Sequence, residues 1–226
     1  MKSSPASYPS RDLQPLPHGR GSELPPRIGN GVQSRDRKGA VGCRPSALLG
    51  RILPRSFYAR PAVEVARDLL GCVLAHGNRA GRIVETEAYL GLDDRAAHAW
   101  RGLTNRTRVL FGPPGHAYVY LIYGMYECLN LVAEPDGKPG CVLIRALEPV
   151  CGLTRSATGP GRLTRAMGIT RRHNGQDVTH GSLVVRRPRQ LELFSIAVSP
   201  RVGITHCADW PLRFYIEGNR YVSSSR

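Results

Sequence analysis

The feature that most constrains the fold is a run of short segments that read as β-strands, separated by turns rich in glycine and proline. The segments are residues 72–75, 82–89, 118–132 and 141–147. The clearest helical repeat covers residues 62–70, where apolar residues recur three and four positions apart before Gly71. We therefore predict an α+β fold: a single compact domain around a curved antiparallel β-sheet with a protruding β-hairpin, flanked by short helices.

Residues 1–52 are predicted to form a disordered basic tail, and residues 53–226 the folded domain. The first segment is rich in Pro, Gly, Ser and Arg and shows no sustained periodicity. A secretory signal needs a continuous apolar stretch near its start, and the sequence has none there. An organelle transit peptide and a misassigned start codon both remain compatible with this segment.

The charge of the chain favours a polyanionic partner, either nucleic acid or an anionic membrane surface. The formal net charge is +15. Nine of the 32 Lys and Arg and three of the 17 acids lie in residues 1–52, so the remainder still carries +9. No apolar run approaches the ~20 residues of a membrane helix, so membrane insertion is not expected.

The six cysteines form no CxxC pair and no tight cluster with histidine. This pattern indicates neither a zinc site nor a disulfide framework, so we expect reduced, mostly buried thiols and no metal or cofactor.

The segment 82–89 carries the best catalytic candidates. Written as a strand, it places Ile83, Glu85, Glu87 and Tyr89 on one face. Because a strand normally directs apolar residues to the core, an acid-rich face that ends in a tyrosine indicates a cleft. The alternative is a solvated edge strand. Arg145 lies in the apolar segment 141–147 and needs a carboxylate partner such as Glu87.

Two further features follow this strand in the sequence. Asp93 or Asp94 is expected to cap a short helix through residues 95–100, which would bring His98 back towards the strand; a purely structural histidine is the alternative. Residues 118–132 read as a β-hairpin with its turn at Gly124, so that Tyr123 and Met125 project from the tip. Such a tip suits a wedge that enters a base stack, or else packs under another loop.

These segments resemble the alkyladenine (3-methyladenine) DNA glycosylase family of the mammalian type. The similarity runs from about Pro54 to the C-terminus, and it rests on residues 85–89, 97–98, 118–120, 123–125, 145–149, 159–163, 201–204 and 212–215. It implies a monofunctional DNA N-glycosylase of base excision repair. Such an enzyme flips an alkylated or deaminated purine from duplex DNA and hydrolyses the N-glycosidic bond. It also implies that double-stranded DNA with a damaged purine is the partner and that the protein is a monomer. The expected location is intracellular and DNA-associated: the cytoplasm or nucleoid of a bacterium, or the nucleus or an organelle of a eukaryote.

The resemblance implies a role for each matching residue. Glu87 corresponds to the general base, and Arg145 to its ion-pair and water-positioning partner. Asn130 helps to exclude normal guanine, and the stacking walls of the base pocket are Tyr89, His98 and Tyr120. Tyr123, next to Met125 at the tip, fills the gap left by the flipped nucleotide.

The chemistry of the lesions fits this set of residues. An N-alkylated purine is cationic, so the faces of Tyr89 and Tyr120 attract it more than a normal base. Uncharged lesions also need a proton on the departing base, and the sequence identifies no acid for that step.

Arg162, which follows a Gly-Pro-Gly turn, and Arg213 are candidates for contacts with the DNA backbone. The family usually has a longer helical stretch after residues 147–149, so a surface helix is expected to be absent here.

Other functional classes are also open to test. A non-catalytic damaged-DNA-binding protein of the same fold would keep the hairpin tip and the basic surface, and loss of Glu87 or Arg145 would mark it. A nucleobase deaminase would need a zinc signature that the sequence lacks. A bifunctional lyase would use a lysine, but the chain has only Lys2, Lys38 and Lys138.

Overall fold

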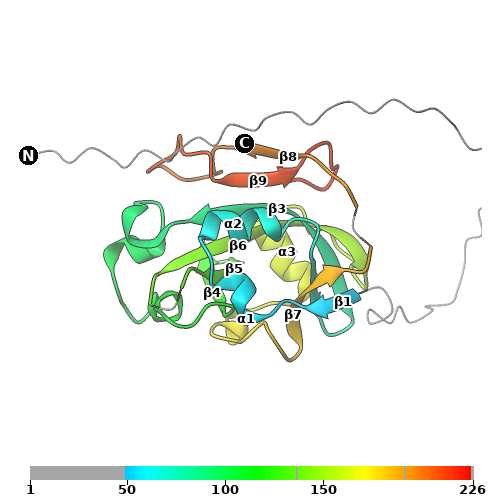
Figure 1. Cartoon of the computed structure of the whole chain (residues 1–226), viewed down its shortest axis with the longest axis horizontal. Coiled ribbons are helices and arrows are strands. Elements are labelled where there is room, and N and C mark those ends of the chain that lie inside the picture. Colours follow the sequence, from blue (N-terminus) through cyan, green and yellow to red (C-terminus); the bar gives the residue numbers. More distant parts are fainter. Residues whose placement is uncertain (1–48, 136, 191, 225–226) are drawn as a thin grey trace, which may run out of the picture. The chain divides into compact units, whose positions relative to one another are not determined.

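The computed structural model describes residues 49–135, 137–190 and 192–224, and its strands form one nine-stranded sheet (Figure 1). The strands are β1 (Leu49–Ile52), β2 (Val73–His76), β3 (Arg79–Tyr89), β4 (Ala117–Ile122), β5 (Tyr126–Ala133), β6 (Gly140–Cys151), β7 (Leu183–Pro188), β8 (Ile196–Ser199) and β9 (Arg213–Ile216). Their order is β1-β7-β2-β3-β6-β5-β4, while β9 pairs with both β3 and β8. All pairs of these strands are antiparallel, which confirms the predicted α+β fold.

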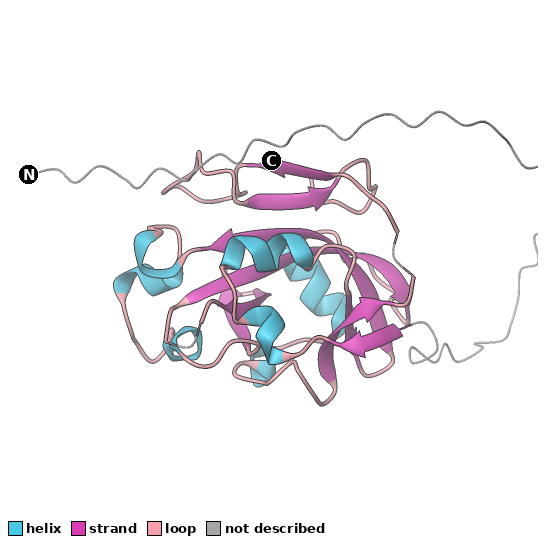
Figure 2. Ribbon diagram, in the orientation of Figure 1, coloured by secondary structure: helices cyan, strands magenta, loops and turns pink. Residues whose placement is uncertain are grey.

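The helices are short and pack against the sheet (Figure 2). They are α1 (Arg55–Tyr58), α2 (Ala62–Asp68), α3 (Pro160–Met167) and the 3-10 turns η2 (Gly91–Asp93), η3 (His98–Arg101), η4 (Arg108–Phe111) and η5 (Arg171–His173). α2 confirms the predicted helical repeat, because its spaced apolar residues are buried in the main core together with those of α3. None of the helices in the described ranges is long and apolar enough to cross a membrane.

β3 lies at the centre of the sheet and is paired along both edges. β6 runs along one edge, whereas β2 and β9 divide the other: residues 79–82 pair with β2 and residues 85–87 with β9. Glu85 and Glu87 therefore sit where strands flank β3 on both sides, and both are fully buried. The alternative of a solvated edge strand is wrong for this segment.

A β-bulge in β3 places Ile83 on a different face from the one that simple alternation predicted. Ile83 is opposite Leu147 and Glu85 is opposite Ala146, so two residues of β3 face one residue of β6 at this point. As a result, Ile83 joins Val84 in the main hydrophobic core rather than the face that carries the carboxylates. The predicted alternation holds from Glu85 to Tyr89.

Alternation along β5 and along residues 141–146 of β6 separates the core from a pocket. On β6, Val142, Ile144 and Ala146 belong to the main core, whereas Cys141, Leu143 and Arg145 line the pocket. β5 behaves in the same way, with Leu129 and Leu131 in the core and Cys128 and Asn130 at the pocket. The sheet thus has one face that stabilises the fold and one face that carries polar chemistry.

The described structure begins before the boundary that was expected at residue 53. β1 pairs with β7 through Leu49 and Ile52, so residues 49–52 belong to the sheet. The rest of the expected tail, residues 1–48, lies outside the described residues.

Cys151 is disulfide-bonded, which corrects the expectation of a reduced thiol at this position, whereas Cys72, Cys128, Cys141 and Cys207 are free.

Candidate active site

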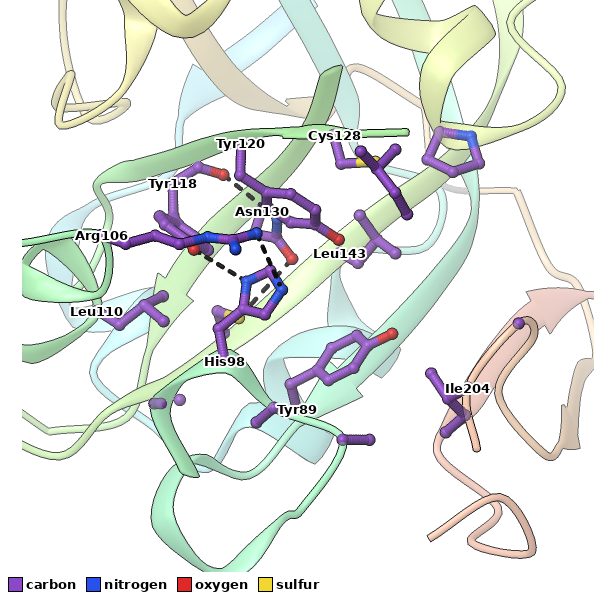
Figure 3. A pocket seen from close by; sticks show the side chains of 18 of the residues that line it. Tyr89, His98, Arg106, Leu110, Tyr118, Tyr120, Cys128, Asn130, Leu143 and Ile204 are labelled. Atoms are coloured by element: carbon purple, nitrogen blue, oxygen red, sulfur yellow. Dashed lines mark hydrogen bonds between the residues drawn. The ribbon is translucent and has the colours of Figure 1, made fainter. Parts of the chain in front are cut away.

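The residues that alternate out of the core surround a pocket of about 350 Å³ (Figure 3). This volume lies within the range of small-molecule sites in proteins. The strands contribute Tyr89, Tyr118, Tyr120, Cys128, Asn130, Cys141, Leu143 and Arg145, and the connecting segments contribute His98, Arg106, Val202 and Ile204. Gly91 also lines it, with a φ of +78°, and a Cβ at this position would approach the carbonyl oxygen of Pro139 to 1.8 Å.

Glu87 is held by three groups that all line the pocket. Its Oε1 accepts a hydrogen bond from the backbone N–H of Val202 at 2.8 Å and lies 3.1 Å from Nη1 of Arg145. Its Oε2 accepts one hydrogen bond, from the hydroxyl of Tyr89 at 3.0 Å. Since a carboxylate has about four acceptor positions, Oε2 keeps one position for a further donor. Glu87 itself does not line the pocket, but its partners do.

Glu85 differs from Glu87, because it accepts four hydrogen bonds and only one of its partners, Arg145, lines the pocket. Its Oε1 accepts from Nε of Arg145 at 2.8 Å, Nε of Arg213 at 2.7 Å and Oγ of Ser223 at 2.9 Å. Its Oε2 accepts from the backbone N–H of Ser223 at 2.7 Å. Arg213 and Ser223 do not line the pocket, whereas all three partners of Glu87 do. Of the two carboxylates, Glu87 is therefore the one more closely connected to the pocket.

The protonation of Glu87 and Tyr89 follows from their burial. Loss of water raises the pKa of Glu87 above its ordinary value, and Arg145, the Val202 N–H and the Tyr89 hydroxyl act in the opposite direction. Burial, and then the charge of Glu87, raise the pKa of Tyr89 well above its ordinary range. Tyr89 thus remains a hydroxyl donor.

The second wall of the pocket is an aromatic cluster around His98. Its ring meets that of Tyr120 edge to face, with centroids 4.5 Å apart, and its Nδ1 lies 2.9 Å from the hydroxyl of Tyr118 (Figure 3). Nη2 of Arg106 lies 3.3 Å from Nε2 of His98. Because a guanidinium only donates hydrogen bonds, Nε2 accepts and the proton is assigned to Nδ1. Burial, aided by Arg106, lowers the pKa of His98 to about 4, so the ring is neutral at pH 7.

A buried ion pair supports the Tyr89 wall. Arg201 contacts Asp94 through two nitrogens, one at 2.9 Å, and both side chains are fully buried. The guanidinium of Arg201 lies 4.6 Å from the centroid of the Tyr89 ring. Asp94 also accepts from the backbone N–H of Ala96 at 3.0 Å. The expected helix through residues 95–100 is replaced by η3, which begins only at His98, because Asp94 turns inward to Arg201.

The tip of the β4–β5 hairpin places an aromatic residue at the rim of the pocket. Tyr123 is 79% exposed, lines the pocket and has a φ of 53°. This left-handed conformation costs an ordinary residue roughly 1–2 kcal/mol, whereas the next residue, Gly124, adopts it freely. Met125 is also exposed. An exposed tyrosine in a strained backbone contributes little to folding, which suggests that it serves another purpose.

Most of the predicted site residues lie together. Seven of them form or adjoin the pocket: Glu87, Tyr89, His98, Tyr120, Tyr123, Asn130 and Arg145. Arg162 is exposed in the first turn of α3, near Pro160 at the pocket. The structure corrects the expectation for Arg213, which is 4% exposed and paired with Glu85, so that its guanidinium is not available to a phosphate.

Several groups of the site were not predicted from the sequence. Tyr118 shares its strand and parity with Tyr120, so alternation along β4 was a usable signal. The backbone N–H of Val202 has no signal in residue type, and the Arg201–Asp94 pair joins residues 107 positions apart. Among the described residues, no group of three or more His, Cys, Asp or Glu side chains is arranged to hold a metal ion.

A buried carboxylate–arginine pair behind a pocket with aromatic walls is an arrangement suited to an enzyme that acts on a planar ring. Residues 56–220 match the family described as methylpurine-DNA glycosylase. A protein of Methanoculleus marisnigri named "Putative 3-methyladenine DNA glycosylase" is 51% identical over 189 residues, which span 76% of this chain and 98% of that protein. The chain therefore belongs to the methylpurine-DNA glycosylase family, and it is an enzyme of that family.

Two further relatives carry the same name. The protein of Legionella pneumophila (strain Corby) is 46% identical over 182 residues, which span 77% of this chain and 100% of that protein. The protein of Myxococcus xanthus is 48% identical over 181 residues, which span 76% of this chain and 93% of the relative.

Proposed function

We propose that this chain is a monofunctional DNA N-glycosylase of base excision repair. It binds double-stranded DNA, extrudes a damaged purine into the pocket and hydrolyses the bond between base and sugar. The observation that carries the proposal is the unused acceptor position on Oε2 of Glu87, on a carboxylate whose partners line an aromatic pocket.

Glu87 acts on a water molecule. The water donates one hydrogen bond to Oε2, and its oxygen attacks C1′ of the sugar while the N-glycosidic bond breaks. The base leaves with the bonding electron pair, and the water proton passes to Glu87. The ionised carboxylate also stabilises the positive charge that develops on the sugar. Arg145 fixes the orientation of Glu87 through Nη1 while Glu85 holds its Nε.

The pocket holds the extruded base. Removing a base from the duplex costs a few kcal/mol, least for a damaged or mispaired base. Stacking between Tyr89 on one side and Tyr120 with His98 on the other offsets part of this cost. Asn130, on the pocket wall, helps to exclude normal guanine. Tyr123, aided by Met125, fills the space that the nucleotide leaves in the stack.

Contacts with the DNA backbone come from the exposed basic residues around the pocket. Arg162 is the candidate in α3, since it is exposed close to Pro160 at the pocket. We propose that the protein acts as a monomer, because every group assigned to the reaction comes from one chain.

One assay tests the proposal. Purified protein is incubated with defined duplexes that contain 3-methyladenine, 7-methylguanine, hypoxanthine or ethenoadenine, and the released base is measured. We expect release from at least one duplex, with an intact strand at the abasic site. A protein that binds these duplexes tightly but releases no base would be the non-catalytic damaged-DNA-binding alternative, and the proposal would be wrong.

A further inference from the structure

Each of the three guanidinium nitrogens of Arg145 has a partner of its own. Nη1 lies 3.1 Å from Oε1 of Glu87, the carboxylate assigned to the reaction. Nε donates to Oε1 of Glu85 at 2.8 Å, and Nη2 donates to Oγ of Ser223 at 3.3 Å. Because a guanidinium is planar and rigid, the contacts at Nε and Nη2 together fix the direction in which Nη1 points. The geometry of the pair between Arg145 and Glu87 therefore depends on Glu85 and Ser223.

Ser223 uses all of its polar groups in this network. Its Oγ accepts from Nη2 of Arg145 and donates to Oε1 of Glu85 at 2.9 Å. Its backbone N–H donates to Oε2 of Glu85 at 2.7 Å, and its carbonyl oxygen accepts from Nη2 of Arg213 at 3.0 Å. A hydroxyl can accept from a cation and donate to a carboxylate at the same time. Ser223 therefore binds both members of the ion pair between Glu85 and Arg145.

The segment that follows β9 holds Ser223 in this place. Nδ2 of Asn219 donates to Oε2 of Glu148 at 3.1 Å, and its Oδ1 accepts from the backbone N–H of Tyr221 at 2.9 Å. Tyr221 and Val222 pack against the main core. The chain is thus fixed by polar and apolar contacts immediately before Ser223, which allows its hydroxyl to hold another side chain in one orientation.

We propose that Ser223 is a positioning residue of the reaction, which sets the orientation of Arg145 and, through it, that of Glu87. This inference rests on the proposed glycosylase function and gives a role to a residue far along the chain from the pocket strands. Ser223 does not line the pocket, so it acts through Arg145 and not on the base. A displaced Arg145 lets Glu87 turn away from the attacked sugar, which lowers the rate of base release and leaves the affinity for DNA unchanged.

Substitutions at two neighbouring serines test this role. Ser223→Ala removes the hydroxyl and keeps the backbone contacts. Its single-turnover rate constant, on the lesion duplex that the wild type cleaves fastest, should fall by at least about tenfold, as expected for one hydrogen bond to a charged group. The dissociation constant of that duplex should not change. Ser223→Thr keeps the hydroxyl and should retain the wild-type rate. Ser224→Ala is the matched control, because Ser224 is exposed and makes none of the contacts described above.

A spectroscopic measurement separates this inference from the proposed reaction. The Nε–H of Arg145 donates to Glu85, and its exchange with solvent is followed by NMR of the arginine side chains. Ser223→Ala should speed this exchange by about tenfold, whereas Ser224→Ala should not change it. Faster exchange supports the positioning of Arg145 even if the wild type releases no base. The proposal is overturned if Ser223→Ala leaves the exchange unchanged, or if it lowers only the free energy of unfolding while the folded protein releases base at the wild-type rate.

Discussion

The hydroxyl of Tyr89 donates a 3.0 Å hydrogen bond to Oε2 of Glu87, two residues away on the same face of β3. One strand thus supplies a wall of the pocket and the carboxylate behind it. The bond stabilises the ionised form of Glu87, and burial acts in the opposite direction by raising its pKa.

Tyr89→Phe should move the acidic limb of the pH–rate profile to higher pH, by about one pH unit for the loss of one charge-assisted hydrogen bond. The general base must be ionised, and removing the donor raises the pKa of Glu87, so activity is lost earlier as the pH falls. The measurement is kcat/KM for hypoxanthine excision as a function of pH. A uniform drop at all pH values would mean that the hydroxyl does not act through Glu87.

Glu87→Gln and Glu85→Gln should have different consequences. Glu87→Gln should keep lesion binding while excision falls at least ~10²-fold, because it removes the base. Glu85→Gln breaks a buried ion pair, so it should lower the free energy of unfolding by roughly 3–5 kcal/mol. Denaturant unfolding and single-turnover excision measure the two effects. If folded Glu85→Gln loses excision while Glu87→Gln retains it, the assignment of the base is wrong.

Tyr123→Ala should weaken excision from lesion duplexes by tenfold or more, since stacking of an aromatic residue on bases contributes ~1–3 kcal/mol. The variant should act almost normally on the same lesion in single-stranded DNA, where no stack has to be opened. Its folding stability should not fall, because the side chain is 79% exposed. Equal losses on both substrates would show that Tyr123 belongs to the pocket rather than to a wedge.

Asp94→Asn should destabilise the protein by roughly 3–5 kcal/mol, because it leaves the fully buried guanidinium of Arg201 without its charge partner. Excision should also fall in the fraction that remains folded, since Val202, next to Arg201, donates to Glu87. Thermal unfolding and excision below the unfolding temperature are the measurements. Unchanged stability would argue against a structural role for the pair.

Arg162 and Arg213 form a test of exposed against buried arginine. Arg162→Gln should lower the slope of log K against log salt by about 0.9, the loss of one phosphate contact. Arg213→Gln should leave that slope unchanged and reduce stability instead, because its Nε donates to Glu85. Titrations of duplex DNA at several salt concentrations distinguish them. A slope change in Arg213→Gln alone would mean that Arg213, and not Arg162, contacts a phosphate.

The features that could be predicted from the sequence are those encoded in local patterns. Alternation predicted β3 and the hairpin, and spacing at three and four positions predicted α2. The charge of Arg145 in an apolar strand correctly required a carboxylate, because an unpaired buried charge is too costly. His98, Tyr120 and Asn130 were identified through the resemblance to the glycosylase family, not through alternation.

The features that could not be predicted depend on contacts distant in sequence. Arg213 looks like a surface residue until β9 pairs with β3 and brings it to Glu85, 128 positions away. The bulge that turns Ile83 into the core depends on the register between β3 and β6, which alternation within one strand does not specify. The backbone donor at Val202 depends on where a loop lies, and no side chain reports it.

The contact between Glu85 and Ser223 has a consequence for biosynthesis. The two residues are 138 positions apart, and both donors of Ser223 satisfy the carboxylate that holds Arg145. A nascent chain that has emerged from the ribosome only as far as α3 already carries Glu85, Glu87 and Arg145, but it lacks β9 and Ser223. The carboxylate of Glu85 therefore gains its last two donors, and Arg145 its full support, only after residue 223 has been synthesised.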